Sequence, residues 1–152
     1  MSIEILTNAP STPAREAAIK SMRLAMAGDV EAWLDLFAED ALLQDPYGPS
    51  PMDPTGAGRV GKPEIAEFGA IFIRPDSSRF EFRQTLMSGH ACVNIGTITL
   101  RCPEGKTAWT DVVNVYEASS ESHTSELQSP RKLECRLMLE RKHLLAHKPS
   151  YP

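Results

Sequence analysis

The first residue in this chain whose type and place suggest chemistry is Asp45, which stands at the end of a short apolar run. Ala41, Leu42 and Leu43 are typical of a buried strand, and Asp45–Pro46 then places a carboxylate where that strand ends. Proline disfavours helical geometry in the residue before it and removes the next amide donor, so the chain turns here. A carboxylate beside an apolar element is costly unless it is paired or used, and this is why Asp45 is a candidate for chemistry. The alternative is a surface Asx–Pro turn with no chemical role.

The strand predicted over residues 106–116 carries Asn114 near its end. Side chains alternate between the two faces of a strand, so Val112 and Tyr116 share a face with Asn114. Trp109 and Asp111 then lie on the opposite face. If Asn114 points into a cavity, Val112 and Tyr116 line that cavity too, although Tyr116 fits a plain core position equally well.

Two helices are predicted in the first forty residues, ahead of Asp45. Thr12–Pro13 is a typical helix start, and Gly28 is a typical stop. A second, shorter helix is expected to follow the N-cap Asp29 and to run from residue 30 to residue 37 or 38. Residues 1–11 show no usable period and predict a loose arm.

Beyond Asp45 the pattern passes from loop to helix to strands. Residues 49–61, rich in Pro and Gly, predict an irregular loop, and Pro63 opens a third helix that ends at residues 74–76. From Ser78 the hydrophobic period becomes two, which predicts strands near residues 80–86, 91–100 and 106–116. Helices followed by an antiparallel run predict an α+β fold, with three N-terminal helices packed on one face of a curved sheet.

The composition limits the class of protein. The chain has 152 residues, 41% hydrophobic and 24% charged, as expected of one soluble globular domain. A net charge of −4 gives no basic field for nucleic acid or an anionic membrane. No apolar run approaches the roughly 20 residues of a membrane span, and no signal pattern opens the chain. The odd number and irregular spacing of the cysteines argue against a disulfide framework or a zinc site and favour a reducing cytoplasm, and His90 is expected to be solvated in a turn.

The character of the chain changes at Ala118. Residues 1–117 carry 16 acidic and ten basic side chains, net −6, whereas residues 118–152 carry four acidic and six basic ones, net +2. The heptad at residues 123–129 resembles the in-frame translation of a common sequencing-library adapter. We therefore predict a domain over residues 1–117 and a non-native tail over residues 118–152, in which no site is placed. The alternative is a genuine amphipathic helix through the leucines of the tail, which are Leu133, Leu137, Leu144 and Leu145.

Five segments carry a family pattern in the same order as in the family: residues 27–32, 37–41, 45–48, 61–68 and 111–116. Together they resemble ketosteroid isomerase, a member of the wider NTF2-like (SnoaL-like) superfamily. The resemblance covers about residues 14–117 and implies a conical fold in which the helices and sheet enclose an apolar pocket. It also implies a homodimer through the sheet face that bears Trp109, Val113 and Val115. The family has one more strand after the Asn114 strand, so the last strand is expected to be missing here, where the chain runs into the tail.

The resemblance also implies roles for single residues. Asp45 stands at the position of the general base, and Asn114 stands where the family has a protonated aspartic acid that donates a hydrogen bond to the developing oxyanion. Ser21 stands at the position of a second donor, a tyrosine, while Phe37 and Gly69 replace two supporting tyrosines. An amide still donates, but a serine hydroxyl is shorter and less acidic. The base is therefore kept and the oxyanion hole is reduced, and losing one good donor typically costs about 10²–10³ in rate.

Two functions follow for this set of residues. The predicted catalytic residues are Asp45 and Asn114, and the predicted substrate contacts are Ser21, Phe37, Tyr47, Phe68, Val112 and Tyr116. The helical spacing of Phe37 and Phe68 also fits plain core positions. Asp45 favours an isomerase or lyase that needs no cofactor or metal and acts on an apolar molecule with a carbonyl or hydroxyl group. The reduced oxyanion hole favours a non-catalytic ligand-binding or dimerisation module, which the same scaffold also supports.

Overall fold

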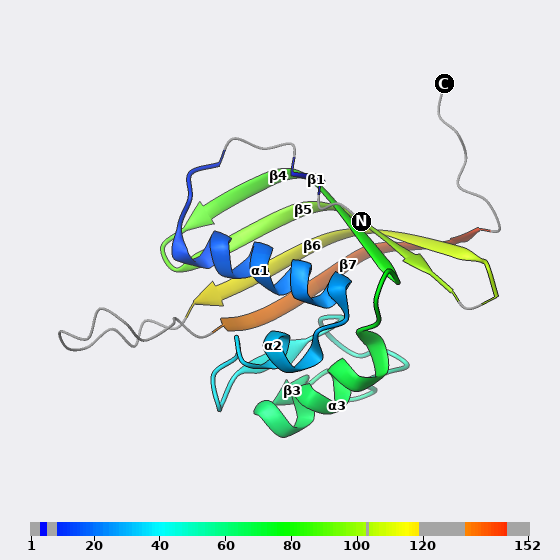
Figure 1. The fold of residues 1–152 in the computed structure, drawn as a ribbon, viewed down its shortest axis with the longest axis horizontal. Coiled ribbons are helices and arrows are strands. Elements are labelled where there is room, and N and C mark those ends of the chain that lie inside the picture. The colour runs from blue at the N-terminus through cyan, green and yellow to red at the C-terminus, as the bar shows by residue number, and fades with distance from the viewer. Residues whose placement is uncertain (1–3, 6–8, 103, 119–132, 146–152) are drawn as a thin grey trace.

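The computed structural model describes residues 4–5, 9–102, 104–118 and 133–145, and within them three helices pack on one mixed sheet. The strands lie in the order β1-β4-β5-β6-β7-β2-β3. Helix α1 crosses β4, β5 and β6, while α2 and α3 lie together beside it at one side of the sheet (Figure 1). This is the predicted α+β, NTF2-like arrangement. None of the helices in the described ranges is long and apolar enough to cross a membrane.

The helices begin and end at the predicted capping residues. In α1 (Pro13–Ala27) the Thr12 side chain accepts a hydrogen bond from the Arg15 amide at 3.2 Å, and Gly28 takes the left-handed C-cap with φ of 75°. A Cβ at Gly28 would also lie 2.5 Å from the Pro75 ring, so only glycine fits. The third helix, α3, spans Lys62–Phe72.

The second helix, α2, is shorter than predicted and spans Val30–Leu34. Its N-cap is as predicted, since the Asp29 carboxylate accepts from the Ala32 amide at 3.0 Å. Beyond Leu34 the chain tightens, because the amides of Leu36 and Phe37 bond to carbonyls three residues back, at Trp33 and Leu34. This turn carries Phe37 into the core, where its side chain is fully buried.

The three central strands confirm the period-two pattern. They are β4 (Ser78–Ser88), β5 (Ala91–Arg101) and β6 (Thr107–Ala118), and they pair antiparallel in that order. The face of β6 that carries Val112, Asn114 and Tyr116 is buried under the helices, as strand parity predicts. A register shift between Phe82 and Gln84 changes the parity of β4, so that Thr85 lies on the same buried side.

Two short strands, β2 and β3, flank the segment that carries Asp45. Strand β2 (Leu42–Gln44) pairs antiparallel with β3 (Arg59–Val60), and Asp45 follows β2 directly. Leu43 belongs to the core that also holds Ile65 and Phe82. Complete burial of such a side chain contributes about 1.5–3 kcal/mol, so the end of β2 is firmly anchored.

The structure corrects two predictions at the sheet edges. Residues 4–5 of the expected loose arm form β1 (Glu4–Ile5), which pairs parallel with residues 81–82 at the outer edge of β4. The last strand is present, because β7 (Leu133–Leu145) pairs with β6 along its length and with β2 at residues 43–44. The alternative helix therefore does not form, and the even spacing of Leu133 and Leu137 fits a strand as well. The adapter-like heptad at residues 123–129 lies outside the described residues, so its origin stays a prediction.

Candidate functional site

A cavity of about 550 Å³ lies between the three helices and the inner face of β4, β5 and β6. This volume is typical of a pocket for a small molecule. Its buried end is formed by Ser21, Met22, Trp33 and Asn114, each at most 5% exposed. Its open end is formed by exposed apolar side chains of α3 and β5, which are Ile71, Phe72 and Leu100. The cavity therefore suits a largely apolar molecule that enters at one end.

Asp45 contributes a carboxylate to this cavity. It follows β2, precedes a cis peptide bond to Pro46, and is half-buried in the cavity wall. Residues 49–58 continue from this turn and add Met52 to the same wall. Asp45 is thus the carboxylate among the lining residues.

The loop that was predicted to be irregular is organised by Asp53. Its carboxylate accepts hydrogen bonds from the Thr55 hydroxyl at 2.7 Å and from the amides of Gly56 and Gly58 at 3.1 and 2.7 Å. The Thr55 hydroxyl first, and then the Gly58 amide, lower the pKa of Asp53 below its ordinary value. The glycines are needed for more than flexibility, since they bring their amides to one carboxylate.

Asn114 is held by a buried relay of neutral polar groups. The Asn94 side chain donates from Nδ2 to Asn114 Oδ1 at 3.1 Å, and the Thr85 hydroxyl donates to Asn94 Oδ1 at 2.8 Å. Asn114 Nδ2 then faces the Met22 sulfur at 3.9 Å, which is a weak acceptor. Asn94 and Asn114 are 4% and 2% exposed, so these bonds replace water. The relay leaves the Asn114 amide with its donor side toward the cavity.

Ser21 makes a different contact from the one that its family position implies. The Trp33 indole donates from Nε1 to Ser21 Oγ at 3.1 Å, and both side chains are buried. The Trp33 ring lies over Gly69, where an added Cβ would come within 3.0 Å of it. Trp33 therefore occupies the space beside Ser21, and the serine keeps its own hydroxyl hydrogen for another acceptor.

The other predicted contacts divide into two groups. Phe68, Val112 and Tyr116 line the cavity. Phe37 does not, because it is fully buried with its ring 4.7 Å from that of Trp33, edge to face. Tyr47 does not either, because it is 57% exposed in the turn after Pro46. Phe37 is thus a core residue and Tyr47 a surface residue, and neither is kept in the site.

Several lining residues were not foreseen. Four of them were not assigned to a site from the sequence, namely Met22, Trp33, Arg74 and Arg101. Ser77 links the backbones of the two arginines. The Arg101 amide donates to the Ser77 carbonyl, and the Ser77 hydroxyl donates to the Arg74 carbonyl. No group of three or more His, Cys, Asp or Glu side chains that could hold a metal occurs in the described part of the chain.

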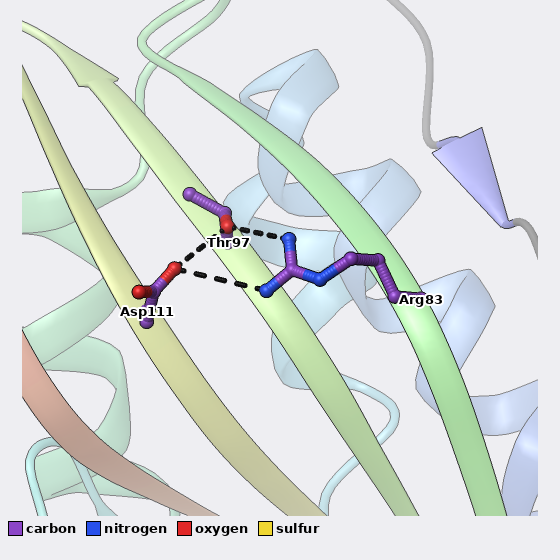
Figure 2. A network of polar contacts seen from close by, with 3 residues as sticks. All are labelled: Arg83, Thr97 and Asp111. Atoms are coloured by element: carbon purple, nitrogen blue, oxygen red, sulfur yellow. Dashed lines mark hydrogen bonds and ion pairs between the residues drawn. The ribbon is translucent and has the colours of Figure 1, made fainter. Parts of the chain in front are cut away.

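A second polar network lies on the outer face of the same three strands. Arg83 of β4 donates to Thr97 of β5 at 2.9 Å and lies 3.7 Å from a carboxylate oxygen of Asp111 on β6. The Thr97 hydroxyl in turn donates to Asp111 at 2.9 Å. Figure 2 shows the three side chains spanning the strands on the face away from the helices.

Comparisons with known proteins agree with this fold. Residues 19–122 match the family model described as a SnoaL-like domain. Delta 5-3-ketosteroid isomerase from Mycobacterium sp. superposes with a TM-score of 0.72 at 22% identity, over 89% of this chain and 100% of that one. RV0760c from Mycobacterium tuberculosis, in complex with estradiol-17beta-hemisuccinate, gives 0.71 at 23% identity, over 86% and 95%. SalBIII, an epoxide hydrolase/cyclase-like enzyme of pyran ring formation in the polyether salinomycin, gives 0.64 at 17% identity, over 83% and 89%. A comparison with curated protein sequences gave no significant match.

Proposed function

Because this chain belongs to the SnoaL-like family, we propose that it binds an apolar small molecule with a carbonyl or hydroxyl group and moves a proton on it. Asp45 is the general acid/base of an isomerase or lyase that uses no cofactor. One observation carries the proposal, which is that Asp45, Ser21 and Asn114 line one largely apolar cavity. Two similar structures, RV0760c in complex with estradiol-17beta-hemisuccinate and a computationally designed 17-OHP binder, support the use of steroid-sized molecules as test ligands.

The reaction needs a base and a donor on the same molecule. Asp45 takes a proton from the carbon beside a carbonyl, and negative charge develops on the carbonyl oxygen. Asn114 donates from Nδ2 to that oxygen, and the low dielectric of the cavity strengthens this bond. Asp45 then returns the proton to another carbon, while Phe68, Val112 and Tyr116 pack against the apolar body of the substrate.

The test replaces Asp45 by Asn and measures turnover on a panel of β,γ-unsaturated ketones with steroid-like skeletons. Positioned acid–base groups typically contribute about 10²–10⁴ in rate, so a loss of that size in kcat is expected with the ligand affinity retained. Asp40→Asn is the matched control, because Asp40 is an exposed carboxylate five residues earlier. Equal turnover by wild type and Asp45→Asn would refute the catalytic role.

A second candidate, a non-catalytic ligand-binding module, is favoured by the contact between Trp33 and Ser21. The Trp33 indole donates to the Ser21 oxygen, and the Trp33 ring covers Gly69, so a short serine hydroxyl stands at the position of the family's strong tyrosine donor. Loss of a strong oxyanion donor costs about 10²–10³ in rate. This candidate predicts tight binding of the same ketones with no turnover above buffer, in wild type and in Asp45→Asn alike.

We also propose a homodimer in the cytoplasm. Family resemblance and the parity of β6 support pairing through the outer face that bears Trp109, Val113 and Val115, and the cysteine pattern supports a reducing compartment. Sedimentation of wild type and Trp109→Glu tests the dimer. A monomeric wild type at micromolar concentration would refute it.

A further inference from the structure

Thr110 of β6 is a polar side chain in the cavity wall whose hydroxyl is not used by the fold. The buried polar side chains among the described lining residues are Ser21, Thr110 and Asn114. Ser21 accepts from Trp33 at 3.1 Å, and Asn114 accepts from Asn94 at 3.1 Å. Thr110 is 7% exposed, and the described part of the chain forms no hydrogen bond with its hydroxyl. The remaining partner for this hydroxyl is whatever fills the cavity.

The strand does not require a hydroxyl at position 110. Threonine and valine have the same branched shape and both favour strands, and Val112 follows Thr110 on the same face of β6. A valine would pair and pack equally well at this position, without the cost of removing a hydroxyl from water. The hydroxyl is accounted for if a ligand bonds to it.

The sheet register places Thr110 between the buried end and the open end of the cavity. From the buried end outward, the paired residues of β5 and β6 on the inner face are Asn94 with Asn114, Gly96 with Val112, Ile98 with Thr110, and Leu100 with Ala108. Leu100 belongs to the open end, so Thr110 lies one pair inside it. Thr110 and Asn114 are four strand residues apart, which is about 13 Å at roughly 3.4 Å per residue. One ligand atom therefore cannot reach both side chains.

We propose that Thr110 is a specificity-determining residue, and that its hydroxyl binds a second oxygen on the ligand, near the open end of the cavity. This inference rests on the proposed function in taking the cavity as a ligand site, and it needs no turnover. A hydroxyl both donates and accepts, so Thr110 bonds either a hydroxyl or a carbonyl on the ligand. Val112 and Ile98 line the wall beside it, so the ligand body there is apolar. The ligand is then an elongated apolar molecule whose second oxygen stands about 13 Å along the wall from Asn114.

The test measures equilibrium binding of two fused-ring ketones that differ at the far end of the skeleton, where one carries a hydroxyl and the other carries hydrogen. Thr110→Val should weaken binding of the hydroxylated ketone about fivefold and leave the affinity for the other unchanged, because one neutral hydrogen bond accounts for that factor. Thr110→Ser keeps the hydroxyl and should keep the preference. Thr99→Val is the matched control and should change neither affinity, because Thr99 pairs with Trp109 on the outer face.

Urea unfolding without ligand separates this role from a structural one. Thr110→Val should unfold at the same urea midpoint as wild type or at a higher one, because the substitution breaks no bond to the described residues and removes a buried polar group. A lower midpoint would show that the hydroxyl has a partner within the protein. A hydroxyl preference that is equal in wild type and Thr110→Val would show that no ligand oxygen meets it. Either result would overturn the inference.

The same measurements distinguish this inference from the proposed catalysis. A hydroxyl preference that depends on Thr110, without turnover, would refute the catalysis alone. Turnover that depends on Asp45, with a preference unchanged in Thr110→Val, would refute the Thr110 site alone. Failure of wild type to bind either ketone would refute both.

Discussion

The sheet carries two three-residue polar networks on the same three strands, one on each face. The inner network joins Thr85, Asn94 and Asn114 through neutral groups, and both of its amides are buried. The outer network joins Arg83, Thr97 and Asp111 through charged groups, and the Arg83 and Asp111 side chains are 50% and 42% exposed (Figure 2). Each takes one residue from each of β4, β5 and β6.

The difference shows how burial decides what a polar network does. Inside the protein, an unpaired group costs about 1–3 kcal/mol, so each amide of the inner network must keep a partner. On the outer face of a single copy of the chain, water replaces any broken bond and screens the charges, so an exposed ion pair there contributes about 0–1 kcal/mol. The inner network therefore specifies a site, while the outer network adds little beyond local order. Four changes test this contrast, from the largest expected effect to the smallest.

Truncation after Ala118 should have the largest effect, because it removes β7 and leaves β6, which carries a member of each network, at a sheet edge. The backbone of β6 loses its partners from Thr107 to Ala118, and β2 loses its pairing at residues 43–44. We expect the free energy of unfolding to fall by more than about 2 kcal/mol, a size that needs loss of real structure. Urea midpoints of the two chains measure it. Unchanged midpoints would favour the prediction that residues 118–152 are a non-native tail.

Local signals made much of the fold predictable from the sequence. Thr12, Gly28 and Asp29 mark helix ends through their own backbone and side-chain chemistry, and all three cap as predicted. Strand parity placed Val112, Asn114 and Tyr116 on one face without any tertiary information. The resemblance to a known family placed Asp45 and Asn114 together at one cavity, which neither residue shows alone.

The remaining features depend on distant pairing and were not predictable in this way. Asn94 becomes a partner of Asn114 only through the register of β5 on β6, and Thr85 joins them only because β4 shifts its register. Phe37 was assigned to the cavity from its family position, but the tight turn after Leu34 directs it into the core. β7 was missed because residues 118–152 were set aside on their composition and the adapter-like heptad. Neither of these signals shows whether the segment can pair with β6.

Asn114→Leu should be the most damaging single substitution in the inner network. It leaves Asn94 Nδ2 buried without an acceptor, so the free energy of unfolding should fall by about 1–3 kcal/mol. The double variant Asn94→Leu with Asn114→Leu should recover part of this loss, because removing both partners leaves fewer unpaired groups than removing one. Urea unfolding of the wild type, both single variants and the double variant completes the cycle. Strictly additive losses would show that the two amides are not coupled.

The buried thiol of Cys92 makes the contribution of the inner face to stability depend on pH. Burial raises the pKa of this thiol above its ordinary 9.0, against smaller opposing effects of Asn94 and Arg15. Because the folded state holds the proton more tightly than the unfolded state, the contribution of Cys92 is complete below about pH 9 and is lost as pH rises through the folded pKa. The stability difference between wild type and Cys92→Ala should therefore shrink above that pH, by at most about 1.4 kcal/mol per pH unit. A difference that stays constant from about pH 8 to about pH 10 would contradict this account.

Arg83→Ala should change the free energy of unfolding least. In a single copy of the chain, water reaches the outer network and replaces the bonds that the substitution removes. Arg83 loses a 2.9 Å bond to Thr97 and a 3.7 Å ion pair with Asp111, yet Thr97 and Asp111 keep their own bond at 2.9 Å. We expect a loss below about 1 kcal/mol that disappears in high salt, since salt screens exposed charges over about 10 Å or less. Urea midpoints at low and high salt measure it. A loss as large as that of Asn114→Leu, unaffected by salt, would mean that water does not reach this face. If that loss also grew with protein concentration, another copy of the chain would cover this face, because self-association makes stability depend on concentration.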